Sequence, residues 1–200
     1  MPATAVPAPG KPKSAADCLQ AVLDTERLLV RPRTVADLDA VVVLNSDPDV
    51  MRFIAPPGDP SMTREAVTAR SFRDVDRGLG YWSVFERPAP DSFIGYVGLF
   101  PVPGQQERIE LSYRFHTASQ GRGFAREAAM ALVAHGFFAL SINEIEVRTH
   151  PANSASLALA KRLGFARQPD QIGWMMGDPQ FLCAVMTAQR ETWSPPTLTP

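Results

Sequence analysis

Hydrophobic and polar residues alternate most regularly between residues 107 and 116 of this chain. Successive side chains of an extended strand point to opposite faces, so alternate positions share a face. The hydrophobic face comprises Ile109, Leu111, Tyr113 and Phe115, and the polar face comprises Glu110, Ser112, Arg114 and His116. This pattern predicts a β-strand that covers a hydrophobic core with one face and carries a row of polar groups on the other.

Shorter patterns predict the remaining elements. Runs of β-branched and aromatic residues predict strands at residues 27–31, 81–86, 93–100, 144–149 and 181–188. Helical spacing preceded by capping residues predicts helices at residues 34–44, 63–78, 126–140 and 153–164, with one or two further turns at 47–53. The resulting order, βααβββαβαβ, predicts an α+β fold in which helices flank a mixed, mostly antiparallel central sheet.

The length and composition of the chain suit one domain. It has 200 residues, of which 45% are hydrophobic and 20% are charged, enough to build a single core. We place this domain at residues 25–193. The proline-rich residues 1–24 are expected to form a mobile tail, and residues 194–200 a disordered one.

Composition also narrows the function classes. The formal net charge of −1 gives no reason to expect a nucleic acid or a membrane as a partner. No apolar run approaches the roughly 20 residues that span a bilayer. Cys18, Cys183 and the histidines show no metal-ligand spacing, so no metal is expected. Two cysteines so far apart favour a reducing, cytoplasmic location.

The segment Gln120–Ala125 follows the alternating strand and opens directly into a helix. The first N–H groups of a helix lack intrahelical partners, and the helix dipole places partial positive charge there. Glycines in such a loop let the backbone approach a phosphate closely. We therefore expect a phosphate or pyrophosphate site, and its candidate residues are Gln120, Gly121, Arg122, Gly123, Phe124 and Ala125.

The pattern Gln-x-x-Gly-x-Ala after a strand resembles the acetyl-coenzyme A pyrophosphate loop of GNAT-superfamily N-acetyltransferases. A second patch, Asn153-x-x-Ser156 followed by Leu163-Gly164-Phe165, is similar to the segment after the fifth strand of that family. The openings Thr25–Pro32 and Ser46–Arg52 resemble the Rim-type branch, the ribosomal-protein N-terminal acetyltransferases. These pieces occur in the family's order.

The resemblance implies a GNAT-like sheet and an activity. Acetyl-CoA would be the acetyl donor, and a primary amine would attack the thioester directly in a ternary complex, without a covalent enzyme intermediate. The strand before the loop would offer a backbone N–H to the thioester oxygen near Tyr113 to Phe115, with Phe115 and His116 contacting the coenzyme. Asn153 would hold the pantetheine amide or an ordered water, although asparagine is also a good N-cap residue.

Two residues are candidates for the chemistry. Glu110 is the candidate general base, because it lies on the polar face of the strand near the expected thioester; the alternative is a solvent-facing carboxylate balanced by Arg114. Ser156 is the candidate donor to the departing thiolate, and the alternative is an inert serine in the first turn of a helix. Many relatives place a tyrosine where this chain has Ala160, so the identity of the acid stays open.

Two other readings compete with acetyl transfer. A nucleotide-dependent oxidoreductase would need a third glycine where this chain has Arg126. A catalytically silent module that binds acyl-CoA on the same fold is the second, and turnover of any amine would exclude it.

The acceptor is either a protein N-terminus, as the Rim-type resemblance implies, or a small-molecule amine. We expect residues 55–80 and a loop at 168–180 to shape its pocket. A homodimer is common in this branch.

Overall fold

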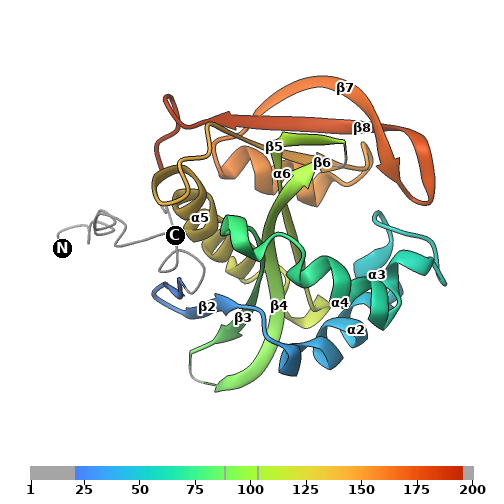
Figure 1. Cartoon of the computed structure of the whole chain (residues 1–200), viewed down its shortest axis with the longest axis vertical. Helices are drawn as coiled ribbons and strands as arrows, with labels where there is room; N and C mark the ends of the chain where they lie inside the picture. Colours follow the sequence, from blue (N-terminus) through green and yellow to red (C-terminus); the bar gives the residue numbers. More distant parts are fainter. Residues whose placement is uncertain (1–20, 88, 103, 196–200) are drawn as a thin grey trace.

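The computed structural model describes residues 21–87, 89–102 and 104–195. An eight-stranded sheet runs through this part of the chain in the order β1-β2-β3-β4-β5-β6-β8-β7 (Figure 1). Only β5 and β6 pair in parallel, so the sheet is mixed and mostly antiparallel, which confirms the predicted α+β class. The strands are β1 (Leu23–Asp24), β2 (Leu28–Pro32), β3 (Gly80–Glu86), β4 (Ala89–Val102), β5 (Gln105–Phe115), β6 (Glu144–Thr149), β7 (Ala166–Met175) and β8 (Asp178–Gln189).

Helices cover both faces of the sheet. The α-helices are α2 (Leu38–Ser46), α3 (Pro48–Met51), α4 (Arg64–Phe72), α5 (Phe124–Phe138) and α6 (Ser154–Arg162). Short 3-10 turns occur at Val35–Asp37, Pro60–Met62, Val75–Arg77 and Thr117–Ser119. Figure 1 shows α2, α3 and α4 grouped on one side of the sheet, away from α5 and α6.

Each face has its own hydrophobic cluster. Small and large side chains of α5, including Ala128, Leu132 and Phe137, pack on the face that carries Leu111 and Phe115 of β5. On the opposite face, Leu38, Val41, Leu44 and Val67 of α2 and α4 pack against Tyr81 and Tyr96. The alternation along β5 is therefore confirmed, because its apolar residues face the larger cluster and its polar residues face the α2 and α4 side.

Several predicted boundaries need correction. Helix α5 begins at Phe124 rather than Arg126, because Gly123, with φ of 81°, caps it. The helix predicted at 63–78 ends at Phe72, and a separate 3-10 turn continues to Gly78, whose φ is 71°. Residues 1–20 and 196–200 of the predicted tails lie outside the described residues, whereas Leu23–Asp24 pair with β2 as a short strand.

The loop predicted at 168–180 is wrong, because most of it forms strand β7 and the start of β8. Pro169 and Gly173 obscured the strand in the sequence. Both are accommodated because β7 is an edge strand whose register with β8 shifts near each of them. Met176 and Gly177, with φ of 55° and 78°, form the tight turn between the paired residues Met175 and Asp178.

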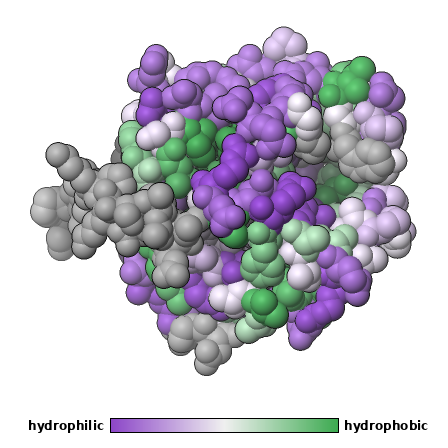
Figure 2. All heavy atoms as spheres, viewed as in Figure 1, coloured by the Kyte–Doolittle hydropathy of each residue, from purple (hydrophilic) through white to green (hydrophobic). Residues whose placement is uncertain are grey.

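Hydrophilic and hydrophobic residues both occur on the face of the molecule that Figure 1 presents. Figure 2 shows hydrophilic residues predominating along the upper edge, where β7 and β8 lie, with hydrophobic residues in smaller patches. None of the helices in the described ranges is long and apolar enough to cross a membrane.

Candidate active site

The sheet opens between its two parallel strands. β5 and β6 are paired only at Ile109 with Ile145 and at Glu110 with Glu146, and beyond these residues the strands diverge. A cavity of about 250 Å³ lies at this opening and reaches side chains from both faces of the sheet. A splayed strand pair thus gives a passage through the sheet.

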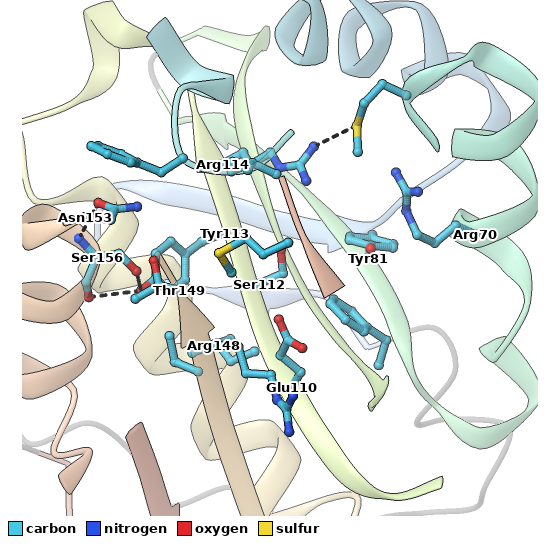
Figure 3. Close-up of a pocket in the computed structure, with 17 residues that line it drawn as sticks. Arg70, Tyr81, Glu110, Ser112, Tyr113, Arg114, Arg148, Thr149, Asn153 and Ser156 are labelled. Atoms are coloured by element: carbon cyan, nitrogen blue, oxygen red, sulfur yellow. Dashed lines mark hydrogen bonds between the residues drawn. The ribbon is translucent and has the colours of Figure 1, made fainter. Parts of the chain in front are cut away.

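The cavity has two chemically different ends (Figure 3). Asn153 and Ser156, at the start of α6, lie at one end, and Arg70 of α4 with Tyr81 of β3 lie at the other. The polar face of β5 lies between them and contributes Glu110, Ser112 and Arg114. The geometry brings together Glu110 and Ser156, the two residues that the sequence proposed for chemistry, on one cavity.

Glu110 is half-buried at the cavity wall. Burial raises the pKa of its carboxyl to about 8, a change that the positive charge of Arg148 partly offsets and the negative charge of Glu146 increases. Arg114 also lowers this pKa. Glu110 is therefore a much stronger base than an exposed carboxylate, and it is mostly protonated at neutral pH.

This pKa predicts a pH-dependent stability. Folded Glu110 keeps its proton up to a pKa of about 8, against an ordinary value of 4.5. Between these values the folded state binds more protons than the unfolded state, so the free energy of unfolding falls as pH rises. Glu110→Gln cannot ionise at this position. We expect its free energy of unfolding to equal that of the native protein at about pH 5 and to be higher by ~2–4 kcal/mol at about pH 8.5.

Urea denaturation at the two pH values measures this difference. Glu107→Gln is the matched control, because Glu107 lies on the same strand with an exposed side chain. A stability gain of Glu110→Gln that is the same at both pH values would contradict the raised pKa.

Tyr113 joins β5 to α6 across the opening. Its hydroxyl lies 2.8 Å from Ser156 Oγ and donates to the Ser156 carbonyl oxygen at 3.2 Å. Burial raises the pKa of Tyr113 to about 12, so the phenol stays protonated at physiological pH. Asn153 caps α6, since its Oδ1 accepts from the Ser156 amide at 3.1 Å. The sequence suggested either coenzyme binding or helix capping for Asn153, and the structure shows the capping hydrogen bond.

The loop after β5 has the backbone geometry that the sequence indicated. Gly121 and Gly123 have φ values of 75° and 81°, a left-handed region that favours glycine. The first helical hydrogen bond of α5 is donated by the Glu127 amide to Gly123 at 3.1 Å, so amides at the start of this helix point out of it. Phe124 is a core side chain, 2% exposed, and its ring also contacts the loop, because the guanidinium of Arg122 lies 4.3 Å from the ring centroid.

The buried carboxylate of Glu127 connects the start of α5 to the segment around Thr25 and Arg27 by hydrogen bonds and an ion pair. Glu127 accepts from the Thr25 hydroxyl at 2.6 Å and from the Arg27 amide at 2.9 Å, and it pairs with the Arg27 guanidinium at 2.6 Å. Arg27 also donates to the carbonyl oxygen of Arg122 at 3.0 Å. The Thr25–Pro32 signature thus has a physical role, because it fixes the first turn of α5. The Arg122 side chain pairs with Glu86 at 2.7 Å.

The edge of β5 that faces the opening carries backbone amides. The His116 amide donates to Ile94 of β4 at 3.1 Å, so it points away from the opening and is not a backbone donor there. Alternation then directs the amides of Tyr113 and Phe115 toward the opening. The carbonyl oxygen of Phe115 accepts from the Gln120 side chain at 3.2 Å, which ties the strand end to the loop.

Comparison with known proteins places the chain in a family. A family model described as an acetyltransferase (GNAT) domain matches residues 27–166. The uncharacterized N-acetyltransferase p20 of Bacillus licheniformis is 30% identical over 148 residues, which cover 73% of this chain and 83% of that protein. The chain belongs to the GNAT acetyltransferase family.

Solved structures of GNAT proteins share its fold. An acetyltransferase from Agrobacterium tumefaciens str. C58 has a TM-score of 0.69 at 26% identity and covers 84% of this chain and 94% of its own. Mycobacterium smegmatis RimJ, solved in complex with CoA-disulfide, has a TM-score of 0.67 at 14% identity, covering 82% of each chain. Rim-type proteins are thus among those with this fold.

This GNAT domain also has cavity residues that the sequence did not single out. The sequence placed Tyr113 on the apolar face of a strand and in the stretch expected to offer a backbone N–H, but it gave the phenol no role. Arg70 lay within residues 55–80, which were expected to shape the acceptor pocket, and Tyr81 lay in a predicted strand, and neither was given a role of its own. The Asn-x-x-Ser pattern placed Ser156 at the start of α6, but its hydrogen bond with Tyr113 depends on the tertiary structure, so the sequence carried no signal for the phenol. No group of three or more His, Cys, Asp or Glu that suits a metal ion occurs within residues 21–87, 89–102 and 104–195.

Proposed function

We propose that this protein is an acetyl-CoA-dependent N-acetyltransferase that acetylates a primary amine by direct attack in a ternary complex. The observation that carries the proposal is the opening between β5 and β6, which begins beyond Glu110 and runs along the end of β5, the strand that the glycine loop follows in the chain. An acyl donor bound along one side and an amine entering from the other would meet beside this carboxyl.

The residues present suit acetyl-CoA. The left-handed glycines and the outward-pointing amides of α5 would hold its pyrophosphate, and the Tyr113 and Phe115 amides would pair with the pantetheine arm. One of these amides would also stabilise negative charge on the thioester oxygen. The Arg122 side chain is already paired with Glu86, so the loop would act mainly through its backbone.

Glu110 would accept the proton of the amine, and Tyr113 would donate a proton to the thiolate. The amine nitrogen forms a bond to the acetyl carbon while Glu110, in its ionised form, takes the proton that the nitrogen loses. The carbon–sulfur bond breaks, and the Tyr113 hydroxyl, coupled to Ser156, would protonate the departing thiolate. The proton that Glu110 has taken then returns through solvent to the Tyr113 phenolate, which restores both groups. The products are the acetylated amine and the free thiol.

Calorimetric titration with acetyl-CoA and, separately, with NADPH tests the coenzyme. We expect acetyl-CoA to bind and NADPH not to bind. Binding of NADPH alone would favour the oxidoreductase reading, and absence of both would point to a fold without a coenzyme. Turnover of any amine acceptor would then exclude a silent acyl-CoA-binding module.

Gly123→Val tests the loop. A Cβ at this position would meet Arg27 Nη2 at 3.3 Å and would place a branched residue at φ of 81°. We expect the Kd for acetyl-CoA to rise by about tenfold, because the loop backbone loses its close approach to the phosphates.

Gly104→Val is the matched control for this change. Gly104 has a similar φ of 75° and open space around its Cβ position, but it lies in the turn between β4 and β5. We expect the same backbone strain there with an unchanged Kd. Unchanged acetyl-CoA affinity in a folded Gly123→Val protein would overturn the loop assignment.

A further inference from the structure

The acceptor end of the cavity carries uncompensated positive charge. Three arginines line the cavity, Arg70, Arg114 and Arg148, with Glu110 as the one carboxylic acid that the described residues contribute to its wall. Arg148 pairs with the buried carboxylate of Glu146, which Arg108 also contacts. Glu146 therefore offsets the charge of Arg148, whereas Arg70 and Arg114 do not belong to this group of ion pairs.

Neither of these two guanidinium groups has a carboxylate partner within residues 21–87, 89–102 and 104–195. Arg70 donates to the carbonyl oxygen of Ser61 at 3.0 Å, and Arg114 donates to Asn45 Oδ1 at 2.8 Å, which are both neutral acceptors. The Nε of Arg114 is buried without a hydrogen-bond partner. The charge of each guanidinium is therefore not offset by an ion pair within the described residues, and each has unused hydrogen-bond donors.

Arg70 and Arg114 share this end of the cavity with the hydroxyl of Tyr81. Burial raises the pKa of Tyr81, and the positive charges of Arg70 and Arg114, which line the cavity with it, partly offset this rise, as does Arg33 on the face of its ring. The Tyr81 hydroxyl has no hydrogen-bond partner in the described part of the chain. Figure 3 shows Tyr81 beside Arg70, on the far side of β5 from Ser156. Two cations and a phenol with a spare hydroxyl make a set of donors that suits a carboxylate.

We propose that the amine acceptor carries a carboxylate, which binds at Arg70, Arg114 and Tyr81 while its amine reaches Glu110. This inference rests on the proposed acetyl transfer and names its substrate class. The same charges disfavour polyamines and other polycationic acceptors, because neither arginine forms an ion pair with a carboxylate in the described part of the chain. They also favour the neutral form of the attacking amine.

The distance between the amine and the carboxylate distinguishes two classes of acceptor. Glu110 and Arg114 lie four residues apart on one face of β5, roughly 13 Å between Cα atoms at the usual rise of a strand. The carboxylate is either that of a free amino acid or an acidic side chain near the N-terminus of a peptide. Acceptors in which the amine–carboxylate separation increases stepwise measure the spacing that the cavity takes.

The experiment compares acetylation of paired acceptors. The first arm uses glycine, β-alanine, 4-aminobutanoate and 6-aminohexanoate against their primary amides. The second uses C-terminally amidated peptides that begin Ser-Glu against Ser-Gln. We expect the carboxylate member of at least one pair to have a kcat/KM about tenfold higher or more, as charge-assisted hydrogen bonds give. The arm that shows the preference identifies the source.

Arg70→Gln should remove this preference, because it should raise KM for the carboxylate acceptor about tenfold and raise KM for the matching amide by much less. Arg73→Gln is the control, because Arg73 follows the same helix with an exposed side chain paired to Asp74. Equal turnover of carboxylates and amides, or a preference for polyamines, would overturn the inference and leave acetyl transfer intact. No transfer to any amine would overturn both.

Discussion

Glu110→Gln is expected to lower kcat by about 100-fold or more, because it removes the group that accepts the proton of the attacking amine. The change keeps the shape of the side chain and lies away from the glycine loop, so the Kd for acetyl-CoA should stay within about twofold. Steady-state kinetics and calorimetry measure the two quantities on one preparation. A kcat equal to that of the native protein would remove Glu110 from the mechanism.

The pH dependence separates a base from a structural carboxylate. The ionised form of Glu110 increases as pH rises through a pKa of about 8, so kcat should rise over the same interval. Glu110→Gln should show a small rate without this increase. The acceptor amine titrates at a similar pH, and repeating the profile with a less basic amine shows which group causes the rise.

The local parts of the fold and site could be predicted from sequence. A period of two places Glu110 and Arg114 on one face of β5 wherever the strand packs. Gly121 and Gly123 lie in the loop that leads into α5, and glycine is the residue that adopts the left-handed conformation without steric cost. Both inferences depend on neighbours in the chain, which is why they needed no tertiary information.

Long-range contacts could not be predicted in this way. The contact of Tyr113 with Ser156 joins residues 43 positions apart, and it exists because β5 and β6 separate after Glu110. The missed strand β7 is held by pairing with β8 despite Pro169, and a proline in an isolated sequence argues against a strand. In each case the partner, rather than the local pattern, decides the structure.

Tyr113→Phe is expected to lower kcat by about 100-fold, the loss typical of removing one donor from a developing anion. The variant keeps the aromatic ring that packs against the larger hydrophobic cluster, so the free energy of unfolding should change by no more than about 1–2 kcal/mol. Ser156→Ala should have a smaller effect, because it leaves the phenol in place. Steady-state kinetics of the two variants and the double variant shows whether the two hydroxyls act as a unit.

The leaving group distinguishes a donor to the thiolate from a residue that only shapes the cavity. A selenol is more acidic than a thiol, so the selenium analogue of acetyl-CoA needs less help as its carbon–selenium bond breaks. We expect the loss in Tyr113→Phe to shrink by about tenfold or more with this donor, whereas the loss in Glu110→Gln should stay the same. A Tyr113→Phe defect of equal size with both donors would assign Tyr113 to positioning and leave the thiolate without this donor.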